Sequence, residues 1–234
     1  MIATAADPGV AIVTGASRGV GRATALAFAG RGLSVGLLGR PGRALTEAAA
    51  EVAARGVRSA AIPCDVSDAE DVERARDEAL TALGTPRVLV NNAGVVHRGP
   101  LVEETAIEDW DRVVSVNLRG PFLIARAFLP AMRVAGRGRL VHVASISATI
   151  GCAGAASYAA SKWGLVGLSK SLAEELRGSG LASIALLPGS IDTEMLVGSG
   201  FAPAMSAEEV ARTIVHLGLD APDAMNGAAV EMFG

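Results

Sequence analysis

A tyrosine and a lysine four residues apart, with a serine thirteen residues before the tyrosine, form the pattern in this sequence most able to do chemistry. They are Tyr158, the only tyrosine of the chain, Lys162 and Ser145. If the segment is helical, residues i and i+4 lie on one face, so the ammonium can approach the phenol. A free tyrosine titrates near ~10, and a unit charge about 4 Å away at an effective dielectric near 20 supplies roughly 4 kcal/mol, enough to bring the pKa to about 7. The pair could then donate or accept a proton near neutral pH.

The same residues have a plainer interpretation, in which a tyrosine and a lysine at helical spacing lie on a solvated surface. A glycine-rich segment near the start of the chain favours an active site. Residues 14–21 read Thr-Gly-Ala-Ser-Arg-Gly-Val-Gly, between an apolar run and an amphipathic segment. At a strand-to-helix junction, free backbone N–H groups and the helix dipole can bind a pyrophosphate. The spacing of Gly15, Gly19 and Gly21 is not that of the G-x-G-x-x-G fingerprint, and a simple tight turn is the alternative.

The end of the expected second strand sets the choice between the two nicotinamide cofactors, because an acidic side chain there binds the ribose 2′-hydroxyl of NAD. No Asp or Glu occurs from Arg22 to Thr46, and the strand runs into Gly39 and Arg40. Guanidinium groups pair with a 2′-phosphate in bidentate fashion. We therefore predict NADP(H), with Arg18 and Arg40 as phosphate ligands; solvated surface arginines are the alternative.

These residues must be positioned by an alternation of short apolar runs with longer amphipathic segments, which is typical of βαβ units. We expect strands at residues 10–14, 33–38, 58–64, 87–91, 140–144, 182–187 and 228–232. We expect helices at residues 21–30, 44–55, 118–134, 158–177 and 210–217, with capping boxes at Ser67–Glu70 and Ser206–Glu209. Buried strands separated by helices predict an α/β fold, a doubly wound parallel sheet with helices on both faces that binds ligands at its carboxyl edge.

The composition excludes several classes of protein. With 50% hydrophobic and 19% charged residues, the chain can bury one core, and we expect a single domain over residues 1–234. A net charge of −3 and 3% aromatic residues disfavour nucleic-acid binding. Cys64 and Cys152 form no CxxC pattern, which predicts a reduced, cytoplasmic protein without a metal site. Met1–Pro8 lacks the pattern of a secretory signal, and Leu140–Ser161 is too polar to span a membrane.

Taken together, these features resemble the short-chain dehydrogenase/reductase family in its compact, NADP-preferring form, the form of 3-oxoacyl-(acyl-carrier-protein) reductases. The resemblance covers nearly the whole chain and implies a seven-stranded Rossmann-like sheet. The motifs that carry it, in the family's order and spacing, are Thr14-Gly15-x-x-x-Gly19-x-Gly21, Asn91-Asn92-Ala93-Gly94, Asn117, Ser145, Tyr158-x-x-x-Lys162 and Pro188-Gly189.

The resemblance also implies which residues bind NADP(H). They lie in the glycine loop, after the second, third, fourth and sixth strands, and in the catalytic set. They are Gly15, Ser17, Arg18, Gly19, Val20, Gly21, Arg40, Asp65, Val66, Asn91, Ala93, Gly94, Tyr158, Lys162, Pro188, Gly189, Ile191 and Thr193. Asp65 and Val66 are implied to lie near the adenine, and the segment from Pro188 to Thr193 near the nicotinamide carboxamide.

Hydride transfer to a ketone leaves negative charge on the carbonyl oxygen, so the site needs hydrogen-bond donors and a proton there. By resemblance, Tyr158 is the general acid in reduction and the general base in oxidation, and Ser145 polarises the carbonyl. Lys162 lowers the pKa of Tyr158 and binds the nicotinamide ribose, and Asn117 holds a water of a proton relay. From the residues alone, Asn117 could be a polar residue bonded to backbone and Ser145 an ordinary residue at a strand end. Ser147 competes with Ser145, but the family spacing to Tyr158 selects Ser145.

A short substrate lid is expected at about residues 193–205, where apolar side chains predict an apolar pocket. The candidate substrate contacts are His97, Ser147, Cys152, Met195 and Phe201. The short lid favours reduction of a 3-oxoacyl thioester or a simple ketone to the secondary alcohol. The alternatives are an NAD(P)-dependent alcohol, polyol or hydroxysteroid dehydrogenase working oxidatively, and a catalytically silent nucleotide-sensing protein. By resemblance, the long helices from Leu118 and Tyr158 pair across a two-fold axis, so we expect a homodimer or homotetramer.

Overall fold

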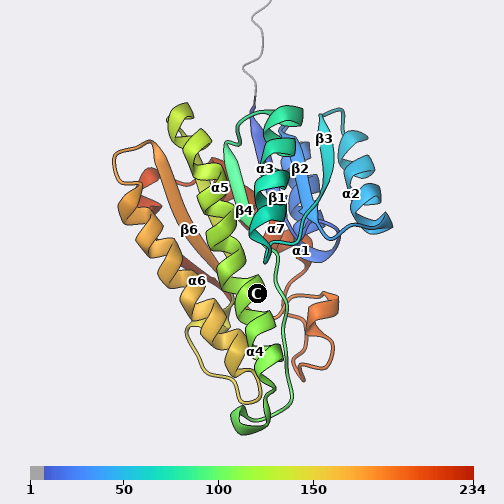
Figure 1. The fold of residues 1–234 in the computed structure, drawn as a ribbon, viewed down its shortest axis with the longest axis vertical. Helices are drawn as coiled ribbons and strands as arrows, with labels where there is room; N and C mark the ends of the chain where they lie inside the picture. Colours follow the sequence, from blue (N-terminus) through green and yellow to red (C-terminus); the bar gives the residue numbers. More distant parts are fainter. Residues whose placement is uncertain (1–7) are drawn as a thin grey trace, which may run out of the picture.

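A computed structural model describes residues 8–234 and shows one parallel sheet of seven strands in the order β3-β2-β1-β4-β5-β6-β7 (Figure 1). The segment predicted to lack a secretory signal, Met1–Pro8, lies outside the described residues except for Pro8. The strands are β1 (Val10–Thr14), β2 (Ser34–Gly39), β3 (Ser59–Pro63), β4 (Val88–Asn91), β5 (Gly138–Val143), β6 (Leu181–Pro188) and β7 (Ala229–Met232). The predicted doubly wound α/β fold is confirmed.

Seven α-helices are present among the described residues, and six of them cover the two faces of the sheet. They are α1 (Gly19–Gly30), α2 (Arg43–Ala53), α3 (Ala69–Leu83), α4 (Ile107–Val114), α5 (Gly120–Ala135), α6 (Ala156–Glu175) and α7 (Ala207–Leu219). One core joins the sheet to α1, α2 and α7, and a second joins it to α3, α5 and α6. The alternation of β1 divides its side chains between the two cores: Ala11 and Val13 belong to the first, Val10 and Ile12 to the second.

Two helix starts test the predicted capping boxes. Ser206 caps α7, and Glu209 returns the hydrogen bond to the Ser206 N–H, so this capping box is confirmed. The capping box predicted at Ser67 is wrong. Asp68 caps α3 instead, accepting from the Asp71 N–H at 2.9 Å, while the Ser67 hydroxyl donates to the Asp65 carboxylate at 2.6 Å. The carboxylate one residue later replaces the serine as the cap.

The long helix that we expected to begin at Leu118 begins earlier and is interrupted. α4 passes through a π turn, Ser115–Arg119, into α5, so the helical path covers residues 107–135. π turns inside helices often occur at functional sites. The loops after β4, β5 and β6 meet this region below the sheet in Figure 1, at the carboxyl ends of the strands. Within residues 8–234, no helix is long and apolar enough to cross a membrane; the cytoplasmic location stays a prediction.

Candidate active site

Ser145 and Tyr158 come together at the carboxyl edge of the sheet. Ser145 follows β5 and caps a 3₁₀ turn, Ile146–Ala148, where its Oγ accepts from the Ser147 N–H at 3.1 Å. Tyr158 lies in the first turn of α6, and a hydrogen bond links its side chain to Ser145. The structure therefore places the predicted serine against the phenol, while Ser147 contacts Ser145 through its backbone.

The predicted acidity of Tyr158 is wrong in direction. Burial raises the pKa of the phenol above its ordinary value, outweighing the lowering by the Ser145 hydrogen bond and by the charge of Arg98. Lys162 is not the cause that we expected, because its Nζ lies 5.6 Å from the centre of the Tyr158 ring and donates at 2.8 Å to the Val143 carbonyl. A phenol that keeps its proton at neutral pH is suited to donating it.

Lys162 is a buried cation, only 4% exposed. Burial lowers its pKa to about 8, because a desolvated ammonium is disfavoured. Gly94 lies next to this side chain: a Cβ added there would be in ordinary van der Waals contact, 3.7 Å from Lys162 Nζ and 3.4 Å from Asn117 Oδ1. The lysine, the glycine and the asparagine thus meet at one place beside Tyr158.

Asn117 lies in the π turn and is completely buried. Its Oδ1 accepts from the Val95 N–H at 2.8 Å, and its Nδ2 donates to the Val95 carbonyl at 2.8 Å. Nδ2 also donates to Ser161 Oγ at 3.1 Å. This geometry matches the interpretation of Asn117 as a polar residue bonded to backbone, since its amide holds the loop after β4 against α6. A proton relay at Asn117 stays a prediction.

The loop between β1 and α1 is held by contacts that require glycine. A Cβ added at Gly21 would lie 2.2 Å from the Gly15 carbonyl oxygen, and one added at Gly15 would lie 2.8 Å from the Ala93 Cα. Thr14 Oγ1 accepts hydrogen bonds from the N–H groups of Asn92 and Ala93, both at 3.0 Å. The loops after β1 and β4 are therefore joined to each other by hydrogen bonds and close packing.

The first turn of α1 has the donors that a pyrophosphate needs. The helix begins at Gly19, and its N-cap residue Arg18 makes no side-chain hydrogen bond to it. The first N–H groups of a helix have no helical acceptor, and with the helix dipole they bind phosphate well. A Cβ added at Gly19 would lie 3.4 Å from Thr193 Cγ2, so the segment after β6 lies over this turn. The donor set fits a nicotinamide dinucleotide.

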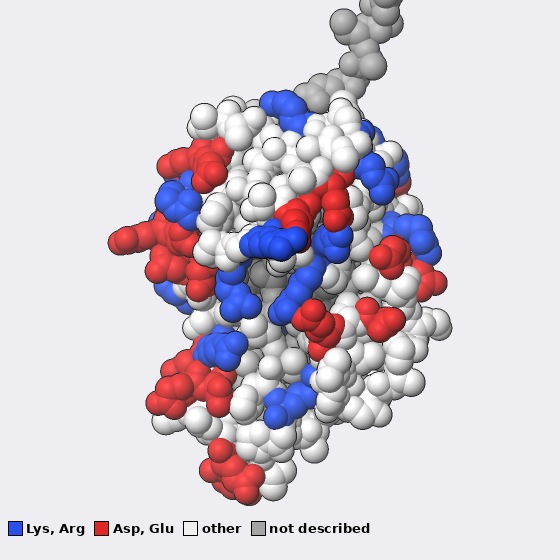
Figure 2. Space-filling view, turned by 90° about the vertical axis from the view of Figure 1, so that its right-hand side faces the viewer, with Lys and Arg blue, Asp and Glu red and all other residues white. Residues whose placement is uncertain are grey.

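The two predicted phosphate ligands have different surroundings. Arg18 forms an ion pair with Glu194, and both side chains are exposed. Arg40 is exposed directly after β2 and forms no ion pair within residues 8–234. A 2′-phosphate would compete with Glu194 for Arg18 but not for Arg40. Figure 2, which views the side of the molecule that carries α2, shows basic side chains around a hollow in this face.

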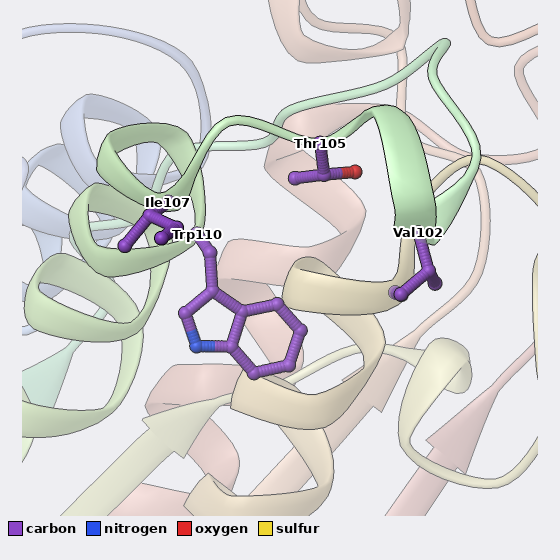
Figure 3. Close-up of a pocket in the computed structure, with 5 residues that line it drawn as sticks. Val102, Thr105, Ile107 and Trp110 are labelled. Atoms are coloured by element: carbon purple, nitrogen blue, oxygen red, sulfur yellow. The ribbon is translucent and has the colours of Figure 1, made fainter.

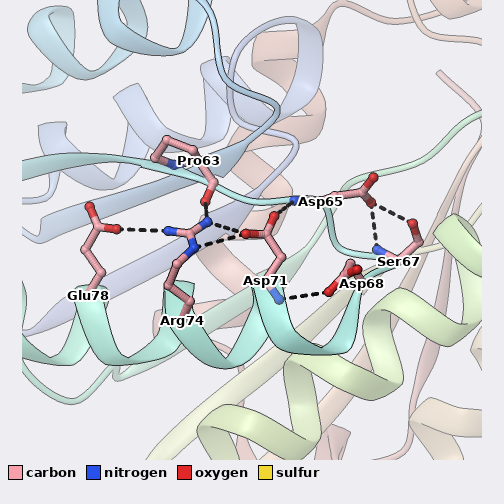
Figure 4. A network of polar contacts seen from close by, with 7 residues as sticks. All are labelled: Pro63, Asp65, Ser67, Asp68, Asp71, Arg74 and Glu78. Atoms are coloured by element: carbon pink, nitrogen blue, oxygen red, sulfur yellow. Dashed lines mark hydrogen bonds and ion pairs between the residues drawn. The ribbon is translucent and has the colours of Figure 1, made fainter.

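Polar contacts fix the loop between β3 and α3, where Asp65 and Val66 lie (Figure 4). The Asp71 carboxylate accepts from the Asp65 N–H at 2.6 Å. Arg74 donates to the Pro63 carbonyl at 2.6 Å and to Asp71. The pKa of the Asp71 carboxyl lies below its usual range, mainly because of the hydrogen bond from the Asp65 N–H and, to a smaller extent, because of the hydrogen bond from Arg74. The backbone at the predicted adenine contacts is therefore set before any ligand binds.

Val66 packs against the start of α5. A Cβ added at Gly120 would lie 3.0 Å from Val66 Cγ2 and 3.1 Å from the Val66 carbonyl oxygen. Gly120 directly follows the π turn that carries Asn117. The predicted adenine contact and Asn117 are thus attached to the same stretch of helix.

Asn91 turns its side chain away from the expected cofactor site. The residue is 2% exposed, and its Nδ2 lies 3.2 Å from Nδ1 of His142 and 3.5 Å from the Pro121 carbonyl oxygen. Burial lowers the pKa of His142 to about 4, so the imidazole is neutral. The Asn91 amide therefore joins β4 to β5 and α5 and is not offered to a ligand, which leaves only its backbone for the predicted contact.

The segment after β6 begins with fixed backbone and continues as the predicted lid. The Gly189 N–H donates to the Met232 carbonyl at 2.8 Å, next to Pro188. Ile191 then pairs with Met205 in an isolated β-bridge. Thr193 leads into a 3₁₀ turn, Glu194–Leu196, which starts the exposed part of the lid.

The predicted substrate contacts are distributed over three loops. His97 Nδ1 lies 3.7 Å from an Asp109 carboxylate oxygen, and Cys152 is an exposed free thiol. Met195 and Phe201 are 38% and 66% exposed in the lid. Their roles toward a substrate stay predictions.

Sequence reasoning missed Arg98. This residue follows His97 in the loop after β4, and its guanidinium donates to the Met195 carbonyl of the lid at 2.7 Å. Its charge also lowers the pKa of Tyr158. No motif marks Arg98; the only available signal was its place four residues after Gly94 in a loop expected to line the site.

A separate pocket of about 180 Å³ lies between α4 and α6 (Figure 3). Its lining residues are Val102, Thr105, Ile107, Trp110 and Ala156. The Trp110 indole extends from α4 toward α6. Ala156 precedes Tyr158 by two residues, and helical residues two apart do not share a face. This pocket is therefore distinct from the catalytic cluster.

Comparison with known proteins agrees with the fold and the motifs. The sequence model that describes short chain dehydrogenases matches residues 9–200. A 1-deoxy-11-beta-hydroxypentalenate dehydrogenase of Streptomyces exfoliatus is 41% identical over 211 residues, which are 86% of this chain and 76% of the relative. A 3-oxoacyl-(acyl-carrier-protein) reductase of Synechocystis is 36% identical over 227 residues, 93% of this chain and 92% of the relative.

The structure also superimposes on a solved member. A crystal structure of a short-chain type dehydrogenase/reductase from Mycobacterium marinum matches with a TM-score of 0.91 at 29% sequence identity. The match covers 97% of this chain and 94% of that chain. Sequence and structure therefore lead to the same group of proteins.

Proposed function

The chain belongs to the short-chain dehydrogenase/reductase family, whose members are oxidoreductases that interconvert carbonyls and alcohols, and from that premise we propose that it is an NADPH-dependent carbonyl reductase. The observation that carries the proposal is the protonated Tyr158 hydroxyl hydrogen-bonded to Ser145, with the Lys162 ammonium behind the ring. This arrangement provides two hydrogen-bond donors and one transferable proton at the carboxyl edge of the sheet.

In the proposed reaction, Ser145 and Tyr158 donate hydrogen bonds to the substrate carbonyl oxygen. When bound, the reduced nicotinamide supplies the hydride. As negative charge develops on the carbonyl oxygen, Tyr158 transfers its proton to that oxygen and becomes a phenolate. The charge of Lys162, held in place by the Val143 carbonyl, stabilises that phenolate across a short path of low dielectric.

The preference for NADP(H) rests on the residues around the end of β2. Arg40 is exposed there and has no ion pair in the part of the chain that the structure describes. The 25 residues from Arg22 to Thr46 contain no acidic side chain that could bind a 2′-hydroxyl. Burying a 2′-phosphate against Arg40 provides a charge-assisted, bidentate contact. Arg18 joins it once Glu194 is displaced.

The proposed substrate is a 3-oxoacyl thioester or a simple ketone, reduced to the secondary alcohol. The short lid and its exposed apolar side chains favour an extended molecule, and the Synechocystis relative is named for the reduction of a 3-oxoacyl group on a carrier protein. The Streptomyces relative is named as a dehydrogenase, which favours oxidation of a secondary alcohol as the second candidate. Initial rates with both substrate classes, in both directions and with both cofactors, decide between the two.

We also propose that the chain assembles as a homodimer or homotetramer through α5 and α6. Phe122 on α5 and Trp163 on α6 are 49% and 55% exposed. Large aromatic side chains at an exposed helix face are typical of the cores of subunit interfaces. Sedimentation of the wild type beside a Trp163→Arg variant measures the contribution of this face.

Tyr158→Phe tests the proposed reaction. The variant should bind NADPH with unchanged affinity, because the phenyl ring keeps its packing, and should lose carbonyl reduction by at least about 100-fold, the usual contribution of a general acid. Ser145→Ala should fall by a similar factor, whereas Ser171→Ala, which removes an exposed hydroxyl at the other end of α6, should stay near the wild type. Turnover by Tyr158→Phe at the wild-type rate would refute the assignment. Tight NADPH binding by a wild type that reduces no carbonyl would favour a nucleotide-sensing protein.

A further inference from the structure

Arg98 connects the two loops that form the walls of the substrate approach. It belongs to the loop after β4, and its guanidinium reaches across to the Met195 carbonyl of the lid at 2.7 Å. Both this loop and the lid lie at the carboxyl edge of the sheet, where Ser145 and Tyr158 lie. The side chain is therefore a cation at the entrance to the proposed site.

The acidic side chains that could neutralise Arg98 bind other groups. Asp109, from α4, lies against His97 at 3.7 Å, and Glu194, in the lid beside Met195, forms an ion pair with Arg18. Within residues 8–234, Arg98 has no carboxylate partner. Among the described residues its one side-chain hydrogen bond goes to a neutral main-chain carbonyl, and most of the five guanidinium N–H donors have no acceptor there.

The field of Arg98 reaches the catalytic hydroxyl. Its charge is one of the influences that lower the pKa of Tyr158, and charge effects of this kind fall steeply once two groups are separated by water. The chain path points the same way, because the N–H of Gly99, the residue after Arg98, donates to the Gly154 carbonyl at 3.0 Å, four residues before Tyr158. The loop that carries Arg98 is thereby held against the start of α6, on the side of the site that carries Tyr158. Met195, whose carbonyl accepts the Arg98 hydrogen bond, adds a partly exposed apolar side chain to the same part of the lid.

We propose that Arg98 is a specificity-determining residue that binds an anionic group, a carboxylate, carried by the substrate a few bonds from the reacting carbonyl. A planar carboxylate accepts two parallel N–H donors from a guanidinium, which a ketone or ester cannot do. The substrate class is then a keto acid or, in the oxidative direction, a hydroxy acid. This inference rests on the proposed carbonyl reductase function, and between its two substrate classes it favours a ketone that carries a carboxylate over a 3-oxoacyl thioester.

Binding of the carboxylate also has a consequence for the lid. Arg98 now donates to a lid carbonyl, so an anion that takes over the guanidinium either replaces that hydrogen bond or shares it through a second N–H. In both cases the substrate is held between the loop after β4 and the lid. A neutral substrate leaves the existing contact in place and gains nothing from Arg98.

Matched acid and ester substrates test the proposal. Pyruvate and levulinate are compared with methyl pyruvate and methyl levulinate, as kcat/KM with NADPH, in the wild type, Arg98→Gln and Arg98→Lys. We expect the wild type to prefer at least one acid over its ester by about tenfold or more, the usual strength of a hydrogen bond to a charged group. In Arg98→Gln this ratio should fall close to one, because kcat/KM for the acid decreases while kcat/KM for the ester is kept. Arg98→Lys should keep part of the preference, because its ammonium retains charge without the bidentate geometry.

Arg112→Gln is the control. Arg112 is an exposed arginine of α4 with no ion pair among the described residues, so the variant makes the same change in net charge away from the proposed contact. It should leave the acid-to-ester ratio unchanged. The proposal is overturned if Arg98→Gln keeps the wild-type ratio, if Arg112→Gln lowers it equally, or if the wild type reduces the esters without preferring any acid. Reduction of no substrate by the wild type would instead refute the reductase function itself, and this inference with it.

The pH profile gives a readout that a merely structural role would not change. Because the charge of Arg98 lowers the pKa of Tyr158, its removal should raise that pKa further. With methyl levulinate, the alkaline limit of kcat/KM should therefore move to higher pH in Arg98→Gln and not in Arg112→Gln. An unmoved limit in Arg98→Gln would place the guanidinium too far from the hydroxyl for the proposed geometry.

Discussion

The nucleotide end and the substrate end of this site are built in different ways. At the nucleotide end, backbones approach so closely that an added Cβ at Gly21 would overlap the Gly15 carbonyl, and Thr14 Oγ1 accepts two N–H groups of the neighbouring loop. At the substrate end, Val197 and Phe201 are 81% and 66% exposed. Close packing specifies the first region, whereas few contacts specify the second. Substitutions should therefore damage folding at one end and change only specificity at the other.

Gly21→Ala should lower the free energy of unfolding more than any other substitution considered below. A small effect would contradict the contrast between the two ends of the site. Its Cβ would lie 2.2 Å from one backbone oxygen and 2.5 Å from Asn92 Nδ2, so the glycine loop has to move. We expect a loss of about 3 kcal/mol or more in the free energy of unfolding, together with loss of cofactor binding. Gly30→Ala is the matched control in the same helix, because nothing lies within 4 Å of an added Cβ there. It should be neutral or stabilise by up to about 1 kcal/mol. Urea denaturation and NADPH titration measure both variants; equal stability of the two would contradict the model of a packed nucleotide end.

Lys162→Met should change the pH dependence of stability by a similar amount. The pKa of Lys162 is about 8 in the folded protein against an ordinary value of 10.5. Between these values the unfolded chain binds a proton that the folded chain does not, so wild-type stability rises with pH across this window. Below pH 8 both states are protonated, and the buried ammonium costs its full desolvation energy.

The rise amounts to roughly 3 kcal/mol between pH 8 and 10.5 at about 1.36 kcal/mol per pH unit, and Lys162→Met should not show it. The measurement is the difference between wild type and variant in unfolding free energy at the two ends of the window. Lys170→Met is the control, since Lys170 is an exposed lysine of the same helix. A wild type as flat as Lys162→Met would show that the ammonium is not buried in solution.

Phe201→Ala should have the smallest effect on folding and would sharpen the comparison. The side chain is 66% exposed, so unfolding free energy should change by less than about 0.5 kcal/mol. Because the ring lies in the lid, KM for an apolar ketone should rise several-fold while the affinity for NADPH stays constant. Val134→Ala, which removes another exposed apolar side chain at the far end of α5, should change neither KM nor affinity. A loss of NADPH affinity in Phe201→Ala would show that the two ends are coupled more strongly than their contacts indicate.

The fold was largely predictable, because it depends on patterns that are local in the sequence. Buried apolar runs such as Val10–Thr14 are typical of interior strands, and this one is followed by a helical segment. The capping box at Ser206 was predictable for the same reason, since both partners lie within four residues. The failure at Ser67 shows the limit of such reasoning: the Ser67 hydroxyl donates to Asp65, and Asp68 accepts from the Asp71 N–H and caps the helix in its place.

The meeting of Ser145 and Tyr158 was predictable from the sequence, whereas the energetics around them were not. Spacing brought Ser145, Tyr158 and Lys162 together, but the helical i to i+4 argument could not show that Lys162 turns to the Val143 carbonyl. It also could not show that burial would raise the pKa of Tyr158, because burial depends on elements far away in the chain. Arg98 was missed because its partner in the lid is distant in sequence and carries no motif.

The base of the lid has one further consequence. The Ser190 carbonyl accepts from the N–H groups of Ala204 and Met205 at 3.0 and 3.2 Å, and the Asp192 N–H donates to the Met205 carbonyl at 2.9 Å. The two ends of the lid are thereby hydrogen-bonded to each other, as in an Ω-loop. Because its two ends are paired with each other, the segment between them can be replaced by a different loop while the strands of the sheet keep their register. Catalytic repertoire would then diversify by transplanting loops of different length, and the chemistry inherited from the sheet would remain the same.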